Sequence, residues 1–237
     1  MLEDAQYLGT SHLVATRSLV KYNDYVYRLL KRGLKLDGEL LEFGPGLGDF
    51  LERFKKEGKL LDCVENEPQF FPVLKPLSRR VAATLDELPG LYDGIVSVNV
   101  LEHIEDDRKI LRDLFAKLKP GGVLNLYLPA GSVLYGHLDA LVHHYRRYDR
   151  PDLVAKVREA GFEVEEVFNV DALGWIAFGI YKLLKWGDGT ITPGSMTLYD
   201  NVVFPFVYVL DPLVGRSFGR SIYLRARKPV SGMTSDV

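Results

Sequence analysis

Short runs of apolar residues alternate along this chain with stretches of helical periodicity, and this alternation limits its folds more than any other feature. Most runs are continuously apolar, as in strands buried on both faces. We expect strands at residues 39–43, 60–65, 80–84, 94–99, 122–128, 162–169 and 221–227. Between them, apolar residues recur at helical spacing, as at Phe50, Leu51 and Phe54. Strands that alternate with helices pair in parallel through right-handed crossovers, so we expect a doubly wound α/β sheet.

Composition argues against several classes of protein. Thirty Lys and Arg against thirty-two Asp and Glu give a net charge of −2, which provides no general basic field for a nucleic-acid backbone. The single cysteine, Cys63, excludes an intrachain disulfide framework and a multi-cysteine zinc site. The first residues lack the features of a signal peptide, so a cytoplasmic location is expected. The longest apolar runs, residues 172–181 and 202–210, are about half of the ~20 residues that a transmembrane helix needs.

A glycine-rich loop joins the first expected strand to the first expected helix. It runs from Glu42 to Gly48, with glycines at the alternate positions 44, 46 and 48. Glycines let the backbone turn sharply and approach a ligand closely, with helix N–H groups pointing at it. A dinucleotide fingerprint, G-x-G-x-x-G, would place its third glycine at Asp49. The carboxylate of Glu42 opposes a pyrophosphate but suits an ammonium group, so the loop favours another ligand than a dinucleotide.

A second acidic residue, Glu65, closes the second expected strand. A carboxylate at this position can accept both hydroxyls of a ribose, and it lies close to the ~20-residue distance from the glycine loop that such a role requires. Many exposed strand ends carry a glutamate, so Glu65 alone indicates little. Together with the glycine loop it supports the binding of a ribose.

These motifs resemble those of the class I S-adenosylmethionine-dependent methyltransferases. The resemblance covers about residues 40–130 and rests on the loop from Glu42 to Gly48, on Glu65, on residues 99–104 (N-V-L-E-H-I) and on residues 119–122 (K-P-G-G). It implies a Rossmann-like sheet of about seven strands, mostly parallel with an antiparallel last strand. It also implies S-adenosyl-L-methionine as cofactor and S-adenosyl-L-homocysteine as product.

The resemblance carries roles for individual residues. The residues expected to bind the cofactor are Glu42, Gly44, Pro45, Gly46, Glu65, Asn66, Thr84, Leu85, Asn99 and Val100. Gly44 and Gly46 would contact the methionine part, and Asn99 would lie against its ammonium or carboxylate. Thr84 and Leu85 would flank the adenine. Many relatives have an aspartate where this chain has Thr84, so the adenine contact there falls to the backbone or the hydroxyl.

The second half of the chain is similar to a bacterial and archaeal subgroup of these enzymes. The similarity lies in residues 135–139 (Y-G-H-L-D), 143–148 (H-H-Y-R-R-Y) and 160–162 (A-G-F). Members of the subgroup often act on small or lipid-linked metabolites, with the substrate region between the fifth and sixth strands. The expected partner is therefore a small or lipid-linked substrate and not a nucleic acid.

Methyl transfer to a hydroxyl or a protonated amine needs a group that accepts a proton, and a histidine suits this task near neutral pH. We expect His144, in a stretch dense with Tyr and Arg, to be this base or a substrate ligand. His103 is interpreted as a helix-capping or packing residue. The residues expected to bind substrate are His12, His137, Tyr145 and Arg147. A set of His137, Asp139 and His144 shows no recognised ligand spacing, so no metal is expected.

We interpret residues 1–237 as a single domain. Its expected parts are an N-terminal helical cap at 1–37, a cofactor-binding core at 38–170, a helical lid insertion at 171–218, a last strand at 219–228 and a flexible tail at 229–237. The insertion is read as a packed lid, and a surface for a greasy substrate or for peripheral membrane contact is the alternative. Monomer and homodimer are both left open.

The sequence thus predicts an S-adenosylmethionine-dependent methyltransferase that acts by in-line displacement on a small or lipid-like metabolite. Two alternatives stay open. One is a nicotinamide-dependent oxidoreductase on a similar sheet, and the other is a non-catalytic cofactor-binding protein. The sequence does not decide whether the acceptor atom is oxygen, nitrogen, carbon or sulfur.

Overall fold

A seven-stranded sheet forms the centre of the protein. The computed structural model describes residue 14 and residues 16–176, 199–211 and 217–230. The strands are β1 (Leu40–Phe43), β2 (Asp62–Val64), β3 (Arg80–Ala82), β4 (Tyr92–Val98), β5 (Leu118–Pro129), β6 (Glu163–Val170) and β7 (Ser221–Arg227). Their order is β3-β2-β1-β4-β5-β7-β6, and only β7 runs antiparallel to its neighbours β5 and β6. The expected sheet, with its antiparallel last strand, is confirmed.

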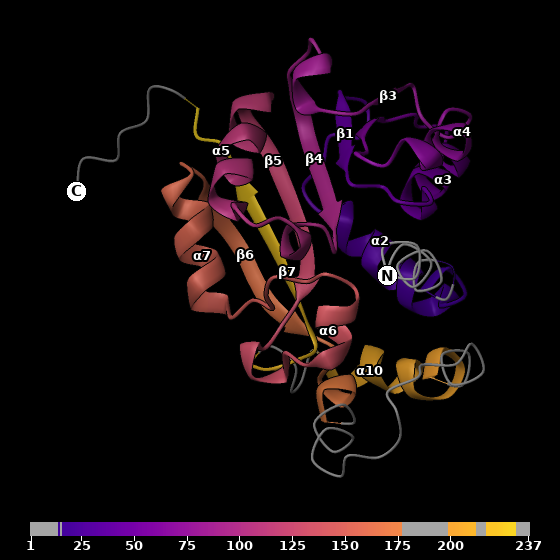
Figure 1. Cartoon of the computed structure of the whole chain (residues 1–237), viewed down its shortest axis with the longest axis vertical. Helices are drawn as coiled ribbons and strands as arrows, with labels where there is room; N and C mark the ends of the chain where they lie inside the picture. The colour runs from indigo at the N-terminus through magenta and orange to yellow at the C-terminus, as the bar shows by residue number, and fades with distance from the viewer. Residues whose placement is uncertain (1–13, 15, 177–198, 212–216, 231–237) are drawn as a thin grey trace.

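Helices cover both faces of the sheet. They are α2 (Val20–Leu30), α3 (Asp49–Lys56), α4 (Phe71–Leu74), α5 (Asp107–Lys117), α6 (His137–Leu141), α7 (Arg150–Glu159) and α10 (Phe204–Leu210). Figure 1 shows α5 and α7 together on one side and α2 and α3 on the other. Two hydrophobic clusters match these layers, one containing Leu111 and Leu153, the other Val26 and Phe54. None of the helices in the described ranges is both long and apolar enough to cross a bilayer.

Strand β5 and the start of helix α7 each show a local irregularity. Strand β5 begins at Leu118, four residues before its expected start at residue 122, because Leu118 pairs with Tyr92 and a register shift between Tyr92 and Gly94 absorbs the irregularity. Asp149 stands at the N-cap of α7, but its side chain does not cap the helix. It accepts hydrogen bonds from the N–H (3.2 Å) and Oγ (2.5 Å) of Ser132 instead.

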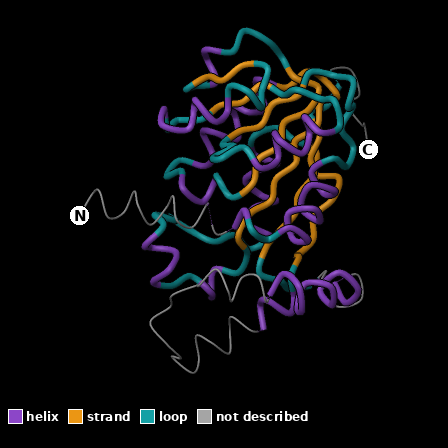
Figure 2. The backbone as a smooth tube through the Cα atoms, turned by 90° about the vertical axis from the view of Figure 1, so that its right-hand side faces the viewer, coloured by secondary structure: helices purple, strands orange, loops and turns teal. Residues whose placement is uncertain are grey.

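The carboxyl ends of β1 and β4 lie side by side at the point where the sheet changes direction. From β1 the chain continues to β2 on one side, and it returns from β3 to β4 on the other. Ligands of open α/β sheets bind at such a switch point. In Figure 1 the parallel strands point toward the end of the sheet where α6 and α10 lie, and Figure 2 shows helical segments beyond the strand ends.

Helix α2 is tied to the rest of the protein at both ends. At its start, Asp200 accepts the N–H groups of Lys21 (3.0 Å) and Tyr22 (2.9 Å), which have no partner inside the helix. At its end, the buried amide of Asn125 on β5 donates to the carbonyls of Leu30 (2.8 Å) and Arg32 (3.0 Å). Because Asp200 belongs to the insertion, α2 connects the insertion to the sheet.

Candidate functional site

The glycine loop follows β1 and lies close to the segment after β4. Gly44, Gly46 and Gly48 have φ angles of 74°, 53° and 81°, in the left-handed region that favours glycine. A Cβ on Gly44 would lie 2.4 Å from Cγ2 of Val100, so a side chain at this position has no room. The sequence of the loop and its position in the sheet therefore agree with the expected cofactor site.

Glu65 is bonded directly to the glycine loop. Its Oε2 accepts the N–H of Gly46 at 2.9 Å, and its Oε1 accepts the N–H of Glu67 at 3.0 Å. Burial raises the pKa of Glu65, and the N–H groups of Glu67 and Gly46 act in the opposite direction. Each carboxylate oxygen keeps further acceptor capacity, so the binding of ribose hydroxyls remains compatible with these bonds. The bond from Gly46 to Glu65 was not predicted from the sequence.

Glu42 is a buried carboxyl group beneath the same loop. It is 1% exposed, and its Oε2 has no hydrogen-bond partner among the described residues. Burial first, then the nearby charges of Asp49 and Glu65, raise the pKa of Glu42 to about 8. Three carboxyl groups near one loop favour a ligand that brings positive charge. The sulfonium and ammonium groups of S-adenosylmethionine fit this requirement.

The other expected cofactor residues lie along the carboxyl ends of β2, β3 and β4. Asn66 is exposed after β2, and Leu85 is buried in the core after β3. The hydroxyl of Thr84 bonds to Oε1 of Glu87 at 3.3 Å, a partner that the sequence analysis did not single out. Asn99 is exposed at a φ of 51°, with its N–H bonded to the carbonyl of Tyr127.

Asp139 organises the residues of the second half. Its Oδ1 accepts hydrogen bonds from Nδ1 of His144 (2.9 Å) and Nε of Arg147 (2.8 Å), and its Oδ2 accepts the N–H of Gly136 (2.9 Å). Burial raises the pKa of Asp139, but its bonds to His144 and Arg147 outweigh this and leave it lowered. Arg147 therefore supports Asp139, and its role in substrate binding stays a prediction.

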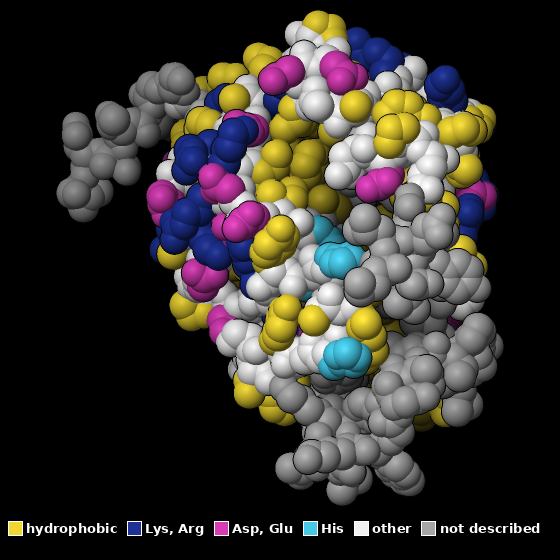
Figure 3. All heavy atoms as spheres, viewed as in Figure 1, with side chains coloured by type: hydrophobic (Ala, Val, Ile, Leu, Met, Phe, Trp, Pro, Cys, Tyr) yellow, Lys and Arg dark blue, Asp and Glu magenta, His cyan; other side chains and the backbone are white. Residues whose placement is uncertain are grey.

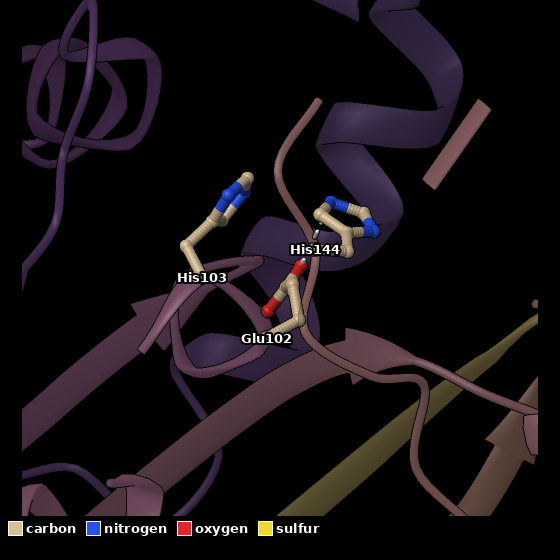
Figure 4. A group of neighbouring side chains, drawn as sticks. All are labelled: Glu102, His103 and His144. Atoms are coloured by element: carbon tan, nitrogen blue, oxygen red, sulfur yellow. Dashed lines mark ion pairs between the residues drawn. The ribbon is translucent and has the colours of Figure 1, made fainter. Parts of the chain in front are cut away.

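His144 also faces two residues that follow β4. Its Nε2 lies 4.0 Å from Oε1 of Glu102, and its ring meets that of His103 edge to face, with centroids 4.6 Å apart (Figure 4). Glu102 is fully buried, and this burial raises its pKa to about 8. The cap of α5 is Asp106 and not His103, which is exposed. Glu102 was not predicted as a site residue, although it stands next to His103 at the exit of β4.

The remaining expected substrate residues are less enclosed. His137 is exposed at the start of α6, and Tyr145 is 55% exposed. His12 lies outside the described residues. On the face seen in Figure 3 the molecule is hollowed, with hydrophobic side chains inside the hollow and histidine side chains at its border. The roles of His144, His137 and Tyr145 stay predictions.

Comparison with protein families gives a match to the family described as "Methyltransferase domain" over residues 15–167. Among curated proteins, the chain is 28% identical over 159 residues to the ubiquinone biosynthesis O-methyltransferase of Xanthomonas euvesicatoria, covering 56% of this chain and 66% of the relative. The enzyme of the same name from Pseudomonas aeruginosa is 31% identical over 98 residues, or 36% of this chain and 42% of the relative. The chain thus spans less than two thirds of these relatives.

Solved structures share the fold at low sequence identity. A SAM-dependent methyltransferase from Thermotoga maritima aligns with a TM-score of 0.60 at 18% identity, covering 89% of this chain and 91% of that one. Phosphoethanolamine N-methyltransferase 2 of Haemonchus contortus, in complex with S-adenosyl-L-methionine, aligns with a TM-score of 0.56 at 19% identity, covering 85% and 51%. The [4+2]-cyclase SpnF aligns with a TM-score of 0.58 at 18% identity, covering 88% and 81%.

Proposed function

The chain belongs to the methyltransferase-domain family, and on this basis we propose that it transfers a methyl group from S-adenosyl-L-methionine to a small, lipid-like acceptor. One observation carries the proposal. The left-handed glycine loop at the switch point of the sheet is joined by the N–H of Gly46 to Glu65 at the end of the neighbouring strand. This arrangement supports a ligand that combines a positively charged chain with a ribose.

When bound, the cofactor supplies a methyl group that is already electrophilic. The residues of this chain therefore have to bind and orient two molecules and exclude water. Asp49 and Glu65 lie close enough to Glu42 to raise its pKa to about 8, and a positively charged ligand at the loop would favour the ionised forms of these carboxyl groups, while Glu65 provides acceptors for the ribose hydroxyls. Close approach of the backbone at Gly44 requires the absence of a side chain.

Two observations support a lipid-like acceptor. The curated relatives are named for ubiquinone biosynthesis. In addition, a groove of about 400 Å³ lies between α2 and α10, and its lining residues are Lys21, Asp24, Arg28, Phe204 and Pro205. Phe206, next to this groove, is 60% exposed. Apolar side chains beside basic ones suit a molecule with an apolar part and an anionic part.

The family match disfavours the nicotinamide-dependent alternative. The non-catalytic alternative needs a separate test, because a fold does not determine a reaction and one structural neighbour is named as a cyclase. A binding protein would retain the glycine loop and Glu65 but would not convert any acceptor.

Calorimetric titration with S-adenosyl-L-homocysteine, compared with NAD, tests the cofactor. We expect binding of the former only, and a preference for NAD would refute the proposal. Incubation with isotope-labelled S-adenosyl-L-methionine and a lipid extract then tests the acceptor, read as label in an apolar product. Label in polar amines alone would contradict the lipid-like class. Cofactor binding without label in any metabolite pool would favour the non-catalytic alternative.

A further inference from the structure

A buried carboxyl group without a hydrogen-bond partner lies beside the two histidines of the site. The side chain of Glu102 is 0% exposed, and neither of its oxygens has a hydrogen-bond partner among the described residues. Leaving a buried polar group unpaired is costly, and native proteins do so rarely. The backbone carbonyl of Glu102, by contrast, accepts the N–H of Tyr145 at 2.7 Å. The side chain therefore needs a partner that the polypeptide does not supply.

Two imidazoles stand next to this carboxylate. One ligand atom from each of Glu102, His103 and His144 can be chosen so that all three lie within 4.8 Å of one another. Figure 4 shows the carboxylate of Glu102 between the two rings, with His103 and His144 projecting to the same side. His103 is exposed, so solvent reaches this side of the cluster.

Asp139 holds His144 in the orientation that a metal ligand requires. The bond of 2.9 Å between Nδ1 of His144 and Oδ1 of Asp139 leaves Nε2 directed toward Glu102. Metal-binding histidines almost always donate their second ring N–H to a carboxylate or carbonyl in this manner. Asp139 is itself fixed by Arg147 and by the N–H of Gly136. The outer partners of a metal ligand are thus present.

We propose that Glu102, His103 and His144 bind a divalent transition-metal ion of the zinc class. Two imidazole nitrogens and one carboxylate oxygen form a set typical of Zn²⁺ and related ions, whereas Mg²⁺ and Ca²⁺ prefer oxygen ligands. Bonds of about 2.1 Å in tetrahedral geometry place ligand atoms roughly 3.4 Å apart, so the three side chains draw together on binding. This proposal replaces the sequence-based expectation of no metal and makes His144 a ligand.

The proposed ion would lie near the glycine loop of the expected cofactor site. Glu102 lies two residues after Val100, whose side chain touches the glycine loop at Gly44. Three protein ligands leave a coordination position for water or for a hydroxyl oxygen of the acceptor. An ion there would favour acceptors that offer such an oxygen, and this consequence rests on the proposed function.

Calorimetric titration of EDTA-dialysed protein with ZnCl₂ tests the site without any catalytic assay, and the intense visible absorption of added Co²⁺ reports tetrahedral coordination. We expect one Zn²⁺ per chain in the wild type. Glu102→Gln and His144→Ala should each weaken binding by about 100-fold or more, and Asp139→Asn by about 10–100-fold. His143→Asn is the control, because this exposed neighbour has a φ of 59°, which asparagine tolerates, and it should bind like the wild type.

Thermal unfolding separates loss of the site from loss of the fold. Glu102→Gln should unfold cooperatively at a temperature near that of the wild type without metal, because an amide of nearly the same shape and volume replaces the carboxyl group. Zn²⁺ binding by Glu102→Gln at wild-type affinity would overturn the proposal, and so would failure of the wild type to bind. Retained binding of S-adenosyl-L-homocysteine by Glu102→Gln would show that loss of the metal site leaves the cofactor site intact, so the two proposals are tested independently.

Discussion

Replacement of Gly44 by alanine tests the close approach of the glycine loop to the segment after β4. At a φ of 74° an L-residue costs about 1–2 kcal/mol. The new Cβ would also lie 2.4 Å and 2.8 Å from the two methyl groups of Val100, an overlap that adds about 1–3 kcal/mol. We expect Gly44→Ala to lower the free energy of unfolding by about 2–5 kcal/mol in total.

Gly58→Ala is a matched control for the backbone part of this cost. Gly58 follows α3 at a φ of 79°, and a Cβ there would meet nothing within 4 Å. The Gly58→Ala variant should lose only about 1–2 kcal/mol of its free energy of unfolding, and its affinity for S-adenosyl-L-homocysteine should be unchanged. Gly44→Ala should lose at least about tenfold in that affinity, which corresponds to 1.4 kcal/mol.

Urea unfolding and calorimetry of both variants give the comparison. Val100→Ala in the Gly44→Ala background should relieve part of the steric overlap and so restore part of the lost stability. The double-mutant cycle with Val100→Ala alone isolates the coupling free energy between the two positions. Equal destabilisation by Gly44→Ala and Gly58→Ala, with no coupling to Val100, would refute the reasoning.

Three further predictions concern buried polar groups. Glu42 keeps its proton up to about pH 8 in the folded protein but only to about its ordinary value of 4.5 when unfolded, so stability without cofactor should fall as pH rises from about 5 to 8. Glu42→Gln should flatten this slope in urea unfolding at several pH values, and an unchanged slope would contradict it. Although burial raises the pKa of Asp62, hydrogen bonds from two arginines and a tyrosine lower it to about 2. Asp62→Asn should lower the free energy of unfolding by about 1–3 kcal/mol at pH 7 and reduce the loss of stability between pH 4 and 2. If the variant lost stability in acid as the wild type does, the hydrogen bonds to Asp62 would not stabilise its charged form. Asn125→Ala should cost about 1–3 kcal/mol and increase hydrogen exchange in α2, and unchanged exchange there would show that the amide does not hold the helix.

The parts of the site that follow from local sequence were predictable. The glycine loop and Glu65 stand at strand ends that the apolar pattern located, and the order of the strands brings them together. The cluster of Glu102 and His144 was not predictable, because it forms only when the end of β4 meets the loop after α6. The early start of β5 likewise depends on the pairing of Leu118 with Tyr92. The expected flexible tail, apart from its first two residues, and residues 177–198 and 212–216 of the expected lid lie outside the described residues.

The capping of α2 by Asp200 makes this helix and the insertion depend on each other. Asp200 supplies the acceptors for Lys21 and Tyr22, which precede it by 179 and 178 residues. Helix α2 and the insertion thus share one pair of hydrogen bonds, and separation of the two would leave the amide donors of α2 and the carboxylate of Asp200 without these partners. Truncation or exchange of either segment alone would remove these hydrogen bonds, so a chimera built from a related enzyme has to transplant both.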